Sequence, residues 1–165
     1  VGGGWILNGR PWRGHQGLGG EIGHTVADPA GPVCLCGKRG CVERLASGPY
    51  MAQDLAARGV VDGPVTGQRV AELAAQGQPD ACEILQRGAR ALGVGLGHAI
   101  NFVNPQGIIL GGGVTKSGAA WWRMVRQTAV ATALPEFRCD IIPAALGDDA
   151  PLWGALSLVT DPDAG

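Results

Sequence analysis

Apolar side chains recur three or four residues apart in several stretches of the chain, which is typical of helices. These stretches predict helices over residues 47–59, 66–75, 80–103, 119–133 and about 149–158. Short apolar runs between turn-forming residues predict strands over residues 5–7, 108–110 and 141–142, with one more short strand that ends near Arg13. Strands that alternate with helices indicate the α/β class.

The residues at the ends of these elements carry specific signals. Asn8-Gly9 after the first strand predicts a tight hairpin turn. Ser47, with a proline in the turn that follows, is typical of a helix N-terminus. Asp80 and Glu83 have the spacing of a capping box, so we expect them to open the longest helix.

The longest predicted helix contains four interior glycines, Gly88, Gly93, Gly95 and Gly97. A glycine inside a helix costs about 1 kcal/mol relative to alanine. We therefore expect another backbone or a ligand to approach this helix closely.

Residues 14–48 show neither helical nor alternating periodicity, and the segment is too long for a passive loop. It holds three cysteines, Cys34, Cys36 and Cys41, with His24 ten residues before the first of them. Three thiolates and an imidazole form a complete tetrahedral zinc set. The alternative is a group of uncoordinated or redox-active thiols.

Two carboxylates lie close to this set in the sequence, Glu21 before His24 and Glu43 after Cys41. A metal that fixes the histidine and the cysteines would also hold both carboxylates in place. Such carboxylates can accept hydrogen bonds from vicinal sugar hydroxyls, and a zinc-bound imidazole keeps its second nitrogen for the same purpose. The alternative is that both are solvated charges or helix caps.

Composition and charge exclude several classes of protein. The 165 residues have a mass of 16.8 kDa, 45% hydrophobic and only 16% charged, which fits one folded domain better than a disordered or coiled-coil chain. Thirteen basic and fourteen acidic side chains give a net charge of -1, so we expect no contact of this segment with nucleic acid. No apolar stretch approaches the roughly 20 residues of a membrane helix, and no signal peptide is recognisable, so we expect a cytoplasmic location.

The histidine and cysteine segment resembles the signature of the ROK family of sugar kinases and sugar-responsive repressors. The matching residues are Gly20-Glu21-Ile22-Gly23-His24 and Cys34-x-Cys36-Gly37-x-x-Gly40-Cys41-x-Glu43. The resemblance implies an actin-like ATPase (ribonuclease H-like) lobe with an inserted zinc-binding loop over residues 20–45. It also implies that residues 1–165 are the C-terminal lobe of a protein whose N-terminal lobe is missing here.

The resemblance assigns roles to individual residues. It implies that Glu21, His24 and Glu43 contact a sugar, and that His24, Cys34, Cys36 and Cys41 bind a structural Zn²⁺. The phosphates of MgATP would approach Gly2, Gly3 and Gly4, and the adenosine would lie against Gly111, Gly112 and Gly113. The family also suggests a homodimer.

Two parts of the ROK kinase pattern are absent from this sequence. These are an Asp-x-Gly-Gly-Thr phosphate loop and the Asn-Asp pair whose aspartate acts as general base, so no residue of this chain is assigned as catalytic. Because phosphoryl transfer depends on positioning and charge neutralisation, we expect this segment alone to be inactive or nearly so.

These observations support ATP-dependent phosphorylation of a hexose by a longer or reassembled two-lobe enzyme. The alternative is the sugar-sensing part of a repressor whose DNA-binding segment lies outside this chain. A third possibility, an independent zinc-ribbon interaction module, fits the surrounding α/β scaffold poorly. The residues leave the hexose open among glucose, mannose, fructose and their N-acetylamino relatives.

Overall fold

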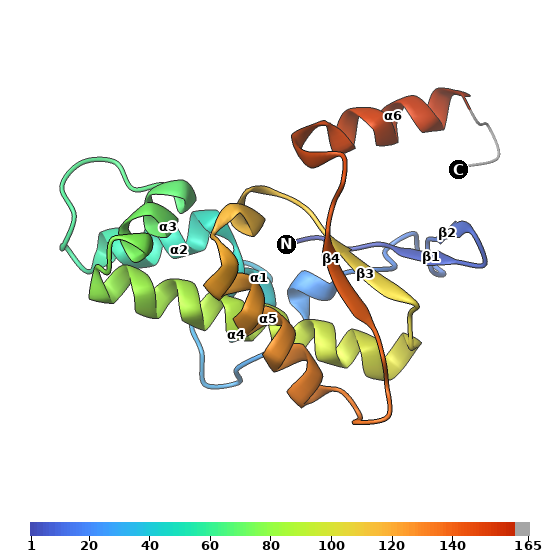
Figure 1. Cartoon of the computed structure of the whole chain (residues 1–165), viewed down its shortest axis with the longest axis horizontal. Helices are drawn as coiled ribbons and strands as arrows, with labels where there is room; N and C mark the ends of the chain where they lie inside the picture. Colours follow the sequence, from blue (N-terminus) through green and yellow to red (C-terminus); the bar gives the residue numbers. More distant parts are fainter. Residues whose placement is uncertain (161–165) are drawn as a thin grey trace.

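The computed structural model describes residues 1–160 and contains two small sheets beside a group of packed helices (Figure 1). Strands β1 (Trp5–Leu7) and β2 (Arg10–Trp12) form an antiparallel hairpin. Strands β3 (Gly107–Leu110) and β4 (Asp140–Pro143) pair in parallel, with Ile108 opposite Ile141. The chain is therefore mixed α/β, as the sequence predicts.

The helices of the described part follow the predicted order, with one addition. They are α1 (Val42–Ala46), α2 (Gly48–Ala57), α3 (Gly67–Ala75), α4 (Pro79–Val103), α5 (Ala119–Thr132) and α6 (Ala150–Thr160). Three 3₁₀ helices join them, η1 (Ile22–His24), η2 (Gly113–Lys116) and η3 (Gly147–Asp149). Helix α1 was not predicted, because its five residues are too few to show a period.

The hydrophobic core surrounds α4, which packs against α1, α2, α3 and α5. Its most deeply buried side chains include Leu55, Val70, Ile84, Ala89 and Val125. The close approach expected from the α4 glycines is confirmed for α5. A Cβ atom added at Gly93 would lie 2.5 Å from Thr128 Cβ, and one at Gly97 would lie 2.4 Å from Thr132 Cβ.

The turn and cap predictions are confirmed except at the start of α4. Asn8 and Gly9 have φ values of 54° and 77°, as a tight hairpin turn requires. Ser47 caps α2 by accepting a hydrogen bond from the Tyr50 amide.

The predicted capping box of Asp80 and Glu83 is wrong. Gln78 caps α4 through its side-chain oxygen, which accepts a hydrogen bond from the Ala81 amide at 2.6 Å. The two carboxylates instead both bind the Arg58 guanidinium, from α2's C-terminal end. Pro79 occupies the first position of the helix, so the cap is at Gln78, and Asp80 lies inside the helix with its carboxylate on Arg58.

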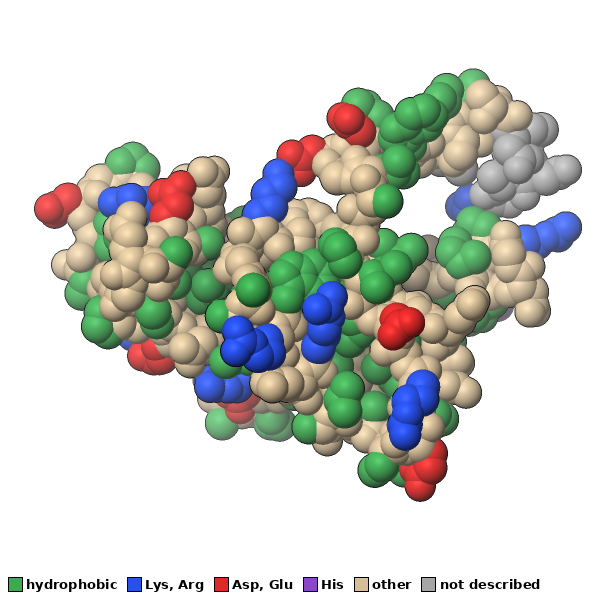
Figure 2. Space-filling model, in the orientation of Figure 1, with side chains coloured by type: hydrophobic (Ala, Val, Ile, Leu, Met, Phe, Trp, Pro, Cys, Tyr) green, Lys and Arg blue, Asp and Glu red, His purple; other side chains and the backbone are tan. Residues whose placement is uncertain are grey.

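Helix α6 stands apart from the packed helices (Figure 1), and many of its exposed side chains are apolar (Figure 2). Leu152, Trp153 and Leu156 are each at least half exposed. Within residues 1–160, no helix combines the length and apolarity that crossing a membrane would need.

Candidate metal and sugar site

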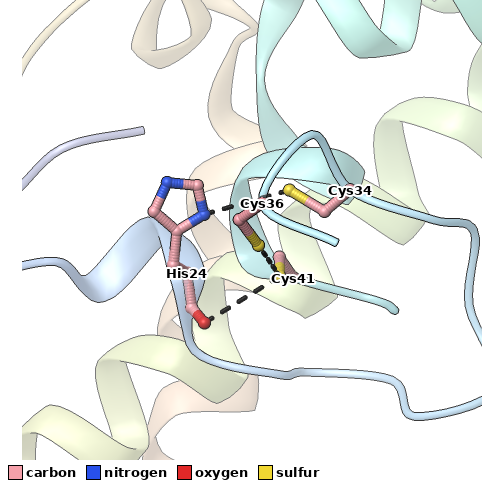
Figure 3. Close-up of side chains that lie close together, drawn as sticks. All are labelled: His24, Cys34, Cys36 and Cys41. Carbon is pink, nitrogen blue, oxygen red and sulfur yellow. Dashed lines mark hydrogen bonds between the residues drawn. The ribbon is translucent and has the colours of Figure 1, made fainter. Parts of the chain in front are cut away.

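The four predicted metal ligands come together from three elements (Figure 3). His24 ends η1, Cys34 and Cys36 lie in the loop that follows, and Cys41 directly precedes α1. Their ligand atoms all lie within 4.8 Å of one another. The sequence prediction that these residues form one cluster is confirmed.

The spacing of these atoms fits a tetrahedral zinc ion. With Zn–S bonds of about 2.3 Å and a Zn–N bond of about 2.0 Å, neighbouring ligand atoms should lie roughly 3.5 to 3.8 Å apart. Cys36 Sγ lies 3.5 Å from Cys41 Sγ, and Cys34 Sγ lies 3.9 Å from His24 Nδ1. A set of three thiolates and one imidazole is a common structural zinc set, so donor chemistry and spacing agree.

The backbone around the cysteines is closed by its own hydrogen bonds. The Cys34 amide donates to the Lys38 carbonyl at 2.8 Å, and the Gly37 amide donates to the Cys34 carbonyl at 2.9 Å. Gly40 has a φ of 62°, and a Cβ atom there would lie 1.5 Å from the Asp28 carbonyl oxygen. Only glycine fits at this position, because any other side chain would overlap the backbone.

The cluster perturbs two of its thiols in opposite directions. A hydrogen bond from the Lys38 backbone lowers the pKa of Cys36 to about 7, with the other thiols and His24 adding to the effect. Burial raises the pKa of Cys41 to about 12, and the neighbouring thiols add to it. A metal ion would release the Cys41 proton, because only the thiolate is a ligand.

The two ring nitrogens of His24 face different groups of residues. Nδ1 faces the cysteines, whereas Nε2 lies 4.0 Å from Oε2 of Glu21. A metal bound at Nδ1 therefore leaves Nε2 directed at the carboxylate side. This is the arrangement needed for one imidazole to serve both the metal and a polyol.

Glu43 lies in the first turn of α1, two residues after the ligand Cys41. Its Oε2 accepts a hydrogen bond from the Val1 nitrogen at 2.6 Å. In a chain that continues before Val1, the same nitrogen is a neutral amide and can still donate.

The predicted phosphate loop lies beside the element that carries Glu21 and His24. A Cβ atom at Gly20 would lie 2.5 Å from the Gly3 carbonyl oxygen, and one at Gly23 would lie 1.9 Å from the Val1 oxygen. The N-terminal glycine segment therefore packs against η1. Gly2 and Gly4 have nothing within 4 Å of an added Cβ, so the space beside their backbone is open.

The predicted adenosine segment is a separate turn. Gly111, Gly112 and Gly113 are exposed and follow β3, at the carboxyl end of the parallel strand pair. Gly112 has a φ of 95° and precedes η2. In α/β proteins, ligands bind outside the carboxyl ends of parallel strands, so the position suits a nucleotide.

An open hollow of about 380 Å³ lies between η1 and the C-terminal half of α4. Its lining is mainly apolar and includes Trp5, Ile22, His98 and Phe102. Of the three predicted sugar ligands, only Glu21 borders it. A sugar needs several hydrogen-bonding partners, and this lining offers few of them.

Sequence reasoning missed the ion pairs that hold α1 in place. Arg44, next to Glu43, binds Asp54 of α2 through two hydrogen bonds of 2.7 and 3.0 Å, and Arg87 of α4 binds the same carboxylate. Tyr50 stacks on Arg44 and accepts a hydrogen bond from the Leu35 amide in the cysteine loop. The contacting pairs are 6 to 33 positions apart in the chain, so no local pattern could have indicated the network.

The sequence model of the ROK family matches residues 1–162. The chain belongs to the ROK family. This agrees with the signature around His24 and with the cluster in Figure 3, which is consistent with the zinc motif of the family.

The ROK chain is similar to both sugar kinases and a transcriptional regulator of the family. It is 37% identical to N-acetylmannosamine kinase of Escherichia coli, over 96% of this chain and 53% of that protein. It is 31% identical to a ROK family glucokinase from Streptomyces griseus, solved in complex with glucose and AMPPNP, with a TM-score of 0.79 over 95% of this chain and 56% of that one. It is 28% identical to a ROK family transcriptional regulator, a homologue of the E. coli MLC protein, with a TM-score of 0.73 over 85% of this chain and 38% of that one. The chain thus spans about half the length of the kinases it matches.

Proposed function

We propose that this ROK chain is the zinc-bearing, sugar-binding C-terminal lobe of an ATP-dependent hexose kinase. The observation that carries the proposal is the 37% identity to a sugar kinase over 96% of the chain. The glucokinase bound to glucose and AMPPNP, 31% identical, supports both ligand classes.

In this proposal Glu21, His24 and Glu43 hold the sugar through hydrogen bonds to its hydroxyl groups. The direction of His24 Nε2 toward Glu21 supports it, because both groups then face the same ligand. Bound zinc holds the loop rigid and takes no part in the reaction. Two carboxylates and an imidazole recognise the hydroxyl pattern of a hexose without fixing its epimer.

MgATP, when bound, supplies the phosphoryl group to the sugar hydroxyl. The backbone amides of Gly2, Gly3 and Gly4 would hold its phosphates, and the open space beside Gly2 and Gly4 supports this role. Gly111, Gly112 and Gly113 would carry the adenosine. The contact of Gly3 with Gly20 supports this role, because direct transfer requires the phosphates to lie beside the sugar.

The general base is proposed to come from the other lobe, because the chain lacks the Asn-Asp pair of the family pattern. The test compares residues 1–165 with the same chain extended upstream in its reading frame. Each is loaded with zinc and MgATP, and ADP release is measured with glucose, N-acetylmannosamine and N-acetylglucosamine. We expect turnover of at least one sugar by the extended chain and none by residues 1–165 alone.

Glu21→Gln in the extended chain should raise the KM for the sugar more than the KM for ATP. An extended chain that phosphorylates none of the hexoses it binds would overturn the kinase proposal. It would favour the second candidate, the sugar-sensing part of a repressor, which the similarity to the ROK transcriptional regulator supports. That candidate also requires sequence-specific DNA binding by the extended chain.

A further inference from the structure

Lys38 crosses from the cysteine loop to the histidine arm of the metal cluster. Its Nζ donates a hydrogen bond of 2.6 Å to the backbone carbonyl of His24, fourteen residues earlier in the chain. Cys41 Sγ faces the same oxygen at 3.9 Å, as the dashed line in Figure 3 marks. The Lys38 side chain thus connects the two segments that supply the ligands.

The charge of the cluster gives this contact a second role. A zinc ion with three thiolates and a neutral imidazole carries a net charge of about -1. Cys34 and Cys41 are 2% and 0% exposed, so water reaches part of this charge poorly. Glu21 adds negative charge beside His24 Nε2, and the Lys38 ammonium, bonded to the His24 carbonyl, carries the opposite charge.

The main chain of Lys38 also contacts the ligand residues. Its carbonyl oxygen accepts a hydrogen bond of 2.8 Å from the Cys34 amide. One residue therefore bonds to two of the four ligand residues, His24 and Cys34, without itself being a ligand. Such outer contacts fix the orientation of the ligands and raise the affinity of a metal site.

We propose that Lys38 is a positioning residue of the metal centre, which ties the His24 backbone to the cysteine loop and offsets the charge of the zinc-loaded cluster. The proposal rests on the zinc site of the proposed function, and it is independent of kinase activity. By holding the His24 backbone, Lys38 also keeps Nε2 directed at Glu21.

Arg39 offers a matched control. It carries the same charge, follows Lys38 in the same loop and also donates to a backbone carbonyl, that of Gly31 at 3.3 Å. Its bond stays within the loop and reaches neither arm of the cluster. Lys38→Gln and Arg39→Gln therefore remove the same charge, but only the first removes the connection to His24.

The test measures zinc affinity of residues 1–165 by competition with a chromogenic chelator. We expect K38Q to bind zinc about tenfold more weakly than wild type, R39Q to stay within about twofold, and K38R to recover most of the loss. Thermal unfolding of the zinc-free proteins should be the same for wild type and K38Q, which separates metal binding from folding.

Equal zinc affinity of K38Q and wild type, or an equal loss in R39Q, would overturn the role of Lys38. A lower unfolding midpoint of zinc-free K38Q than of zinc-free wild type would overturn it too. The side chain would then be a general structural contact. A wild-type chain that binds no zinc would overturn the metal centre itself. The kinase assay tests the proposed function separately.

Discussion

His24 directs its Nε2 atom at Glu21, with 4.0 Å between Nε2 and the carboxylate oxygen Oε2. The other ring nitrogen, Nδ1, faces the cysteines. Any ion that binds Nδ1 therefore fixes the direction of Nε2, and the metal centre and the proposed sugar site share one side chain. Loss of the metal should then affect sugar binding even though the metal touches no sugar.

Removing zinc should loosen the cysteine loop and leave the helical core folded. The loop has few buried apolar side chains, whereas α4 and α5 are packed independently of it. Hydrogen exchange of the zinc-free chain should show lost protection at the Cys34 and Gly40 amides, with α4 and α5 still protected. Glucose or N-acetylmannosamine binding, measured by calorimetry on the extended chain, should weaken in parallel. Unchanged protection of the loop without zinc would contradict the expectation.

Two glycines of the loop provide a matched pair of substitutions. Both Gly37 and Gly40 have positive φ values, 87° and 62°, so alanine is strained at each. A Cβ atom at Gly37 meets nothing within 4 Å, whereas one at Gly40 overlaps the Asp28 carbonyl. Gly37→Ala should therefore cost about 1 kcal/mol and keep zinc binding.

Gly40→Ala should prevent the loop from closing and reduce zinc affinity strongly. Zinc titration with the chelator measures both variants under the same conditions. Because the two share the backbone strain, their difference reports the overlap with Asp28. Similar zinc affinity in the two variants would show that the loop can shift to accept the methyl group.

The residue types of the four metal ligands and their spacing allowed the cluster to be predicted from the sequence. Three cysteines within eight residues and one histidine upstream can converge only if the loop folds back, and Gly37 and Gly40 allow it to do so. The sequence could not indicate which nitrogen of His24 faces the thiols. That choice depends on how η1 lies against α1 and α4, which is a property of the packed structure.

The fold shows the same division between local and distant causes. The hairpin at Asn8-Gly9 and the cap at Ser47 depend on neighbouring residues and were predicted correctly. The cap of α4 was not, because Pro79 begins the helix and the cap is therefore at Gln78. The carboxylates of the expected capping box bind Arg58 instead, and this contact over 22 residues has no local signal.

Substitution of Gly93 tests the contact between α4 and α5. A Cβ atom there would lie 2.5 Å from Thr128 Cβ and 2.8 Å from the Val125 carbonyl oxygen, so α5 would have to move. Gly93→Ala should destabilise the chain by about 1 to 3 kcal/mol, although alanine is the better helix former. At Gly154 in α6, an added Cβ atom meets nothing within 4 Å. Gly154→Ala should therefore be neutral or stabilising by up to about 1 kcal/mol. Denaturant unfolding measures both, and a stabilising Gly93→Ala would show that the helices can separate at no cost.

Asp54 should make the stability of the chain depend on acid pH. Burial by itself would raise the pKa of Asp54, but the hydrogen bonds and charges of Arg44 and Arg87 outweigh it and hold the pKa below its usual value. The unfolded chain therefore takes up the proton first as the pH falls. The stabilisation by Asp54 is complete above the unfolded pKa of about 3.9 and is lost as the pH falls through the folded pKa.

Asp54→Asn should cost about 3 kcal/mol at pH 7, because two arginines lose their common partner in a largely buried site. Its unfolding free energy should then fall less steeply than that of wild type below about pH 4, so the two curves converge. Asp62→Asn, at an exposed position between α2 and α3, should change stability at pH 7 by no more than about 0.5 kcal/mol. Urea unfolding from pH 7 to pH 3 measures all three proteins. Curves for wild type and D54N that stay parallel to pH 3 would mean that the carboxylate keeps the same proton affinity in the folded and unfolded chain, and that the two arginines do not stabilise its charge.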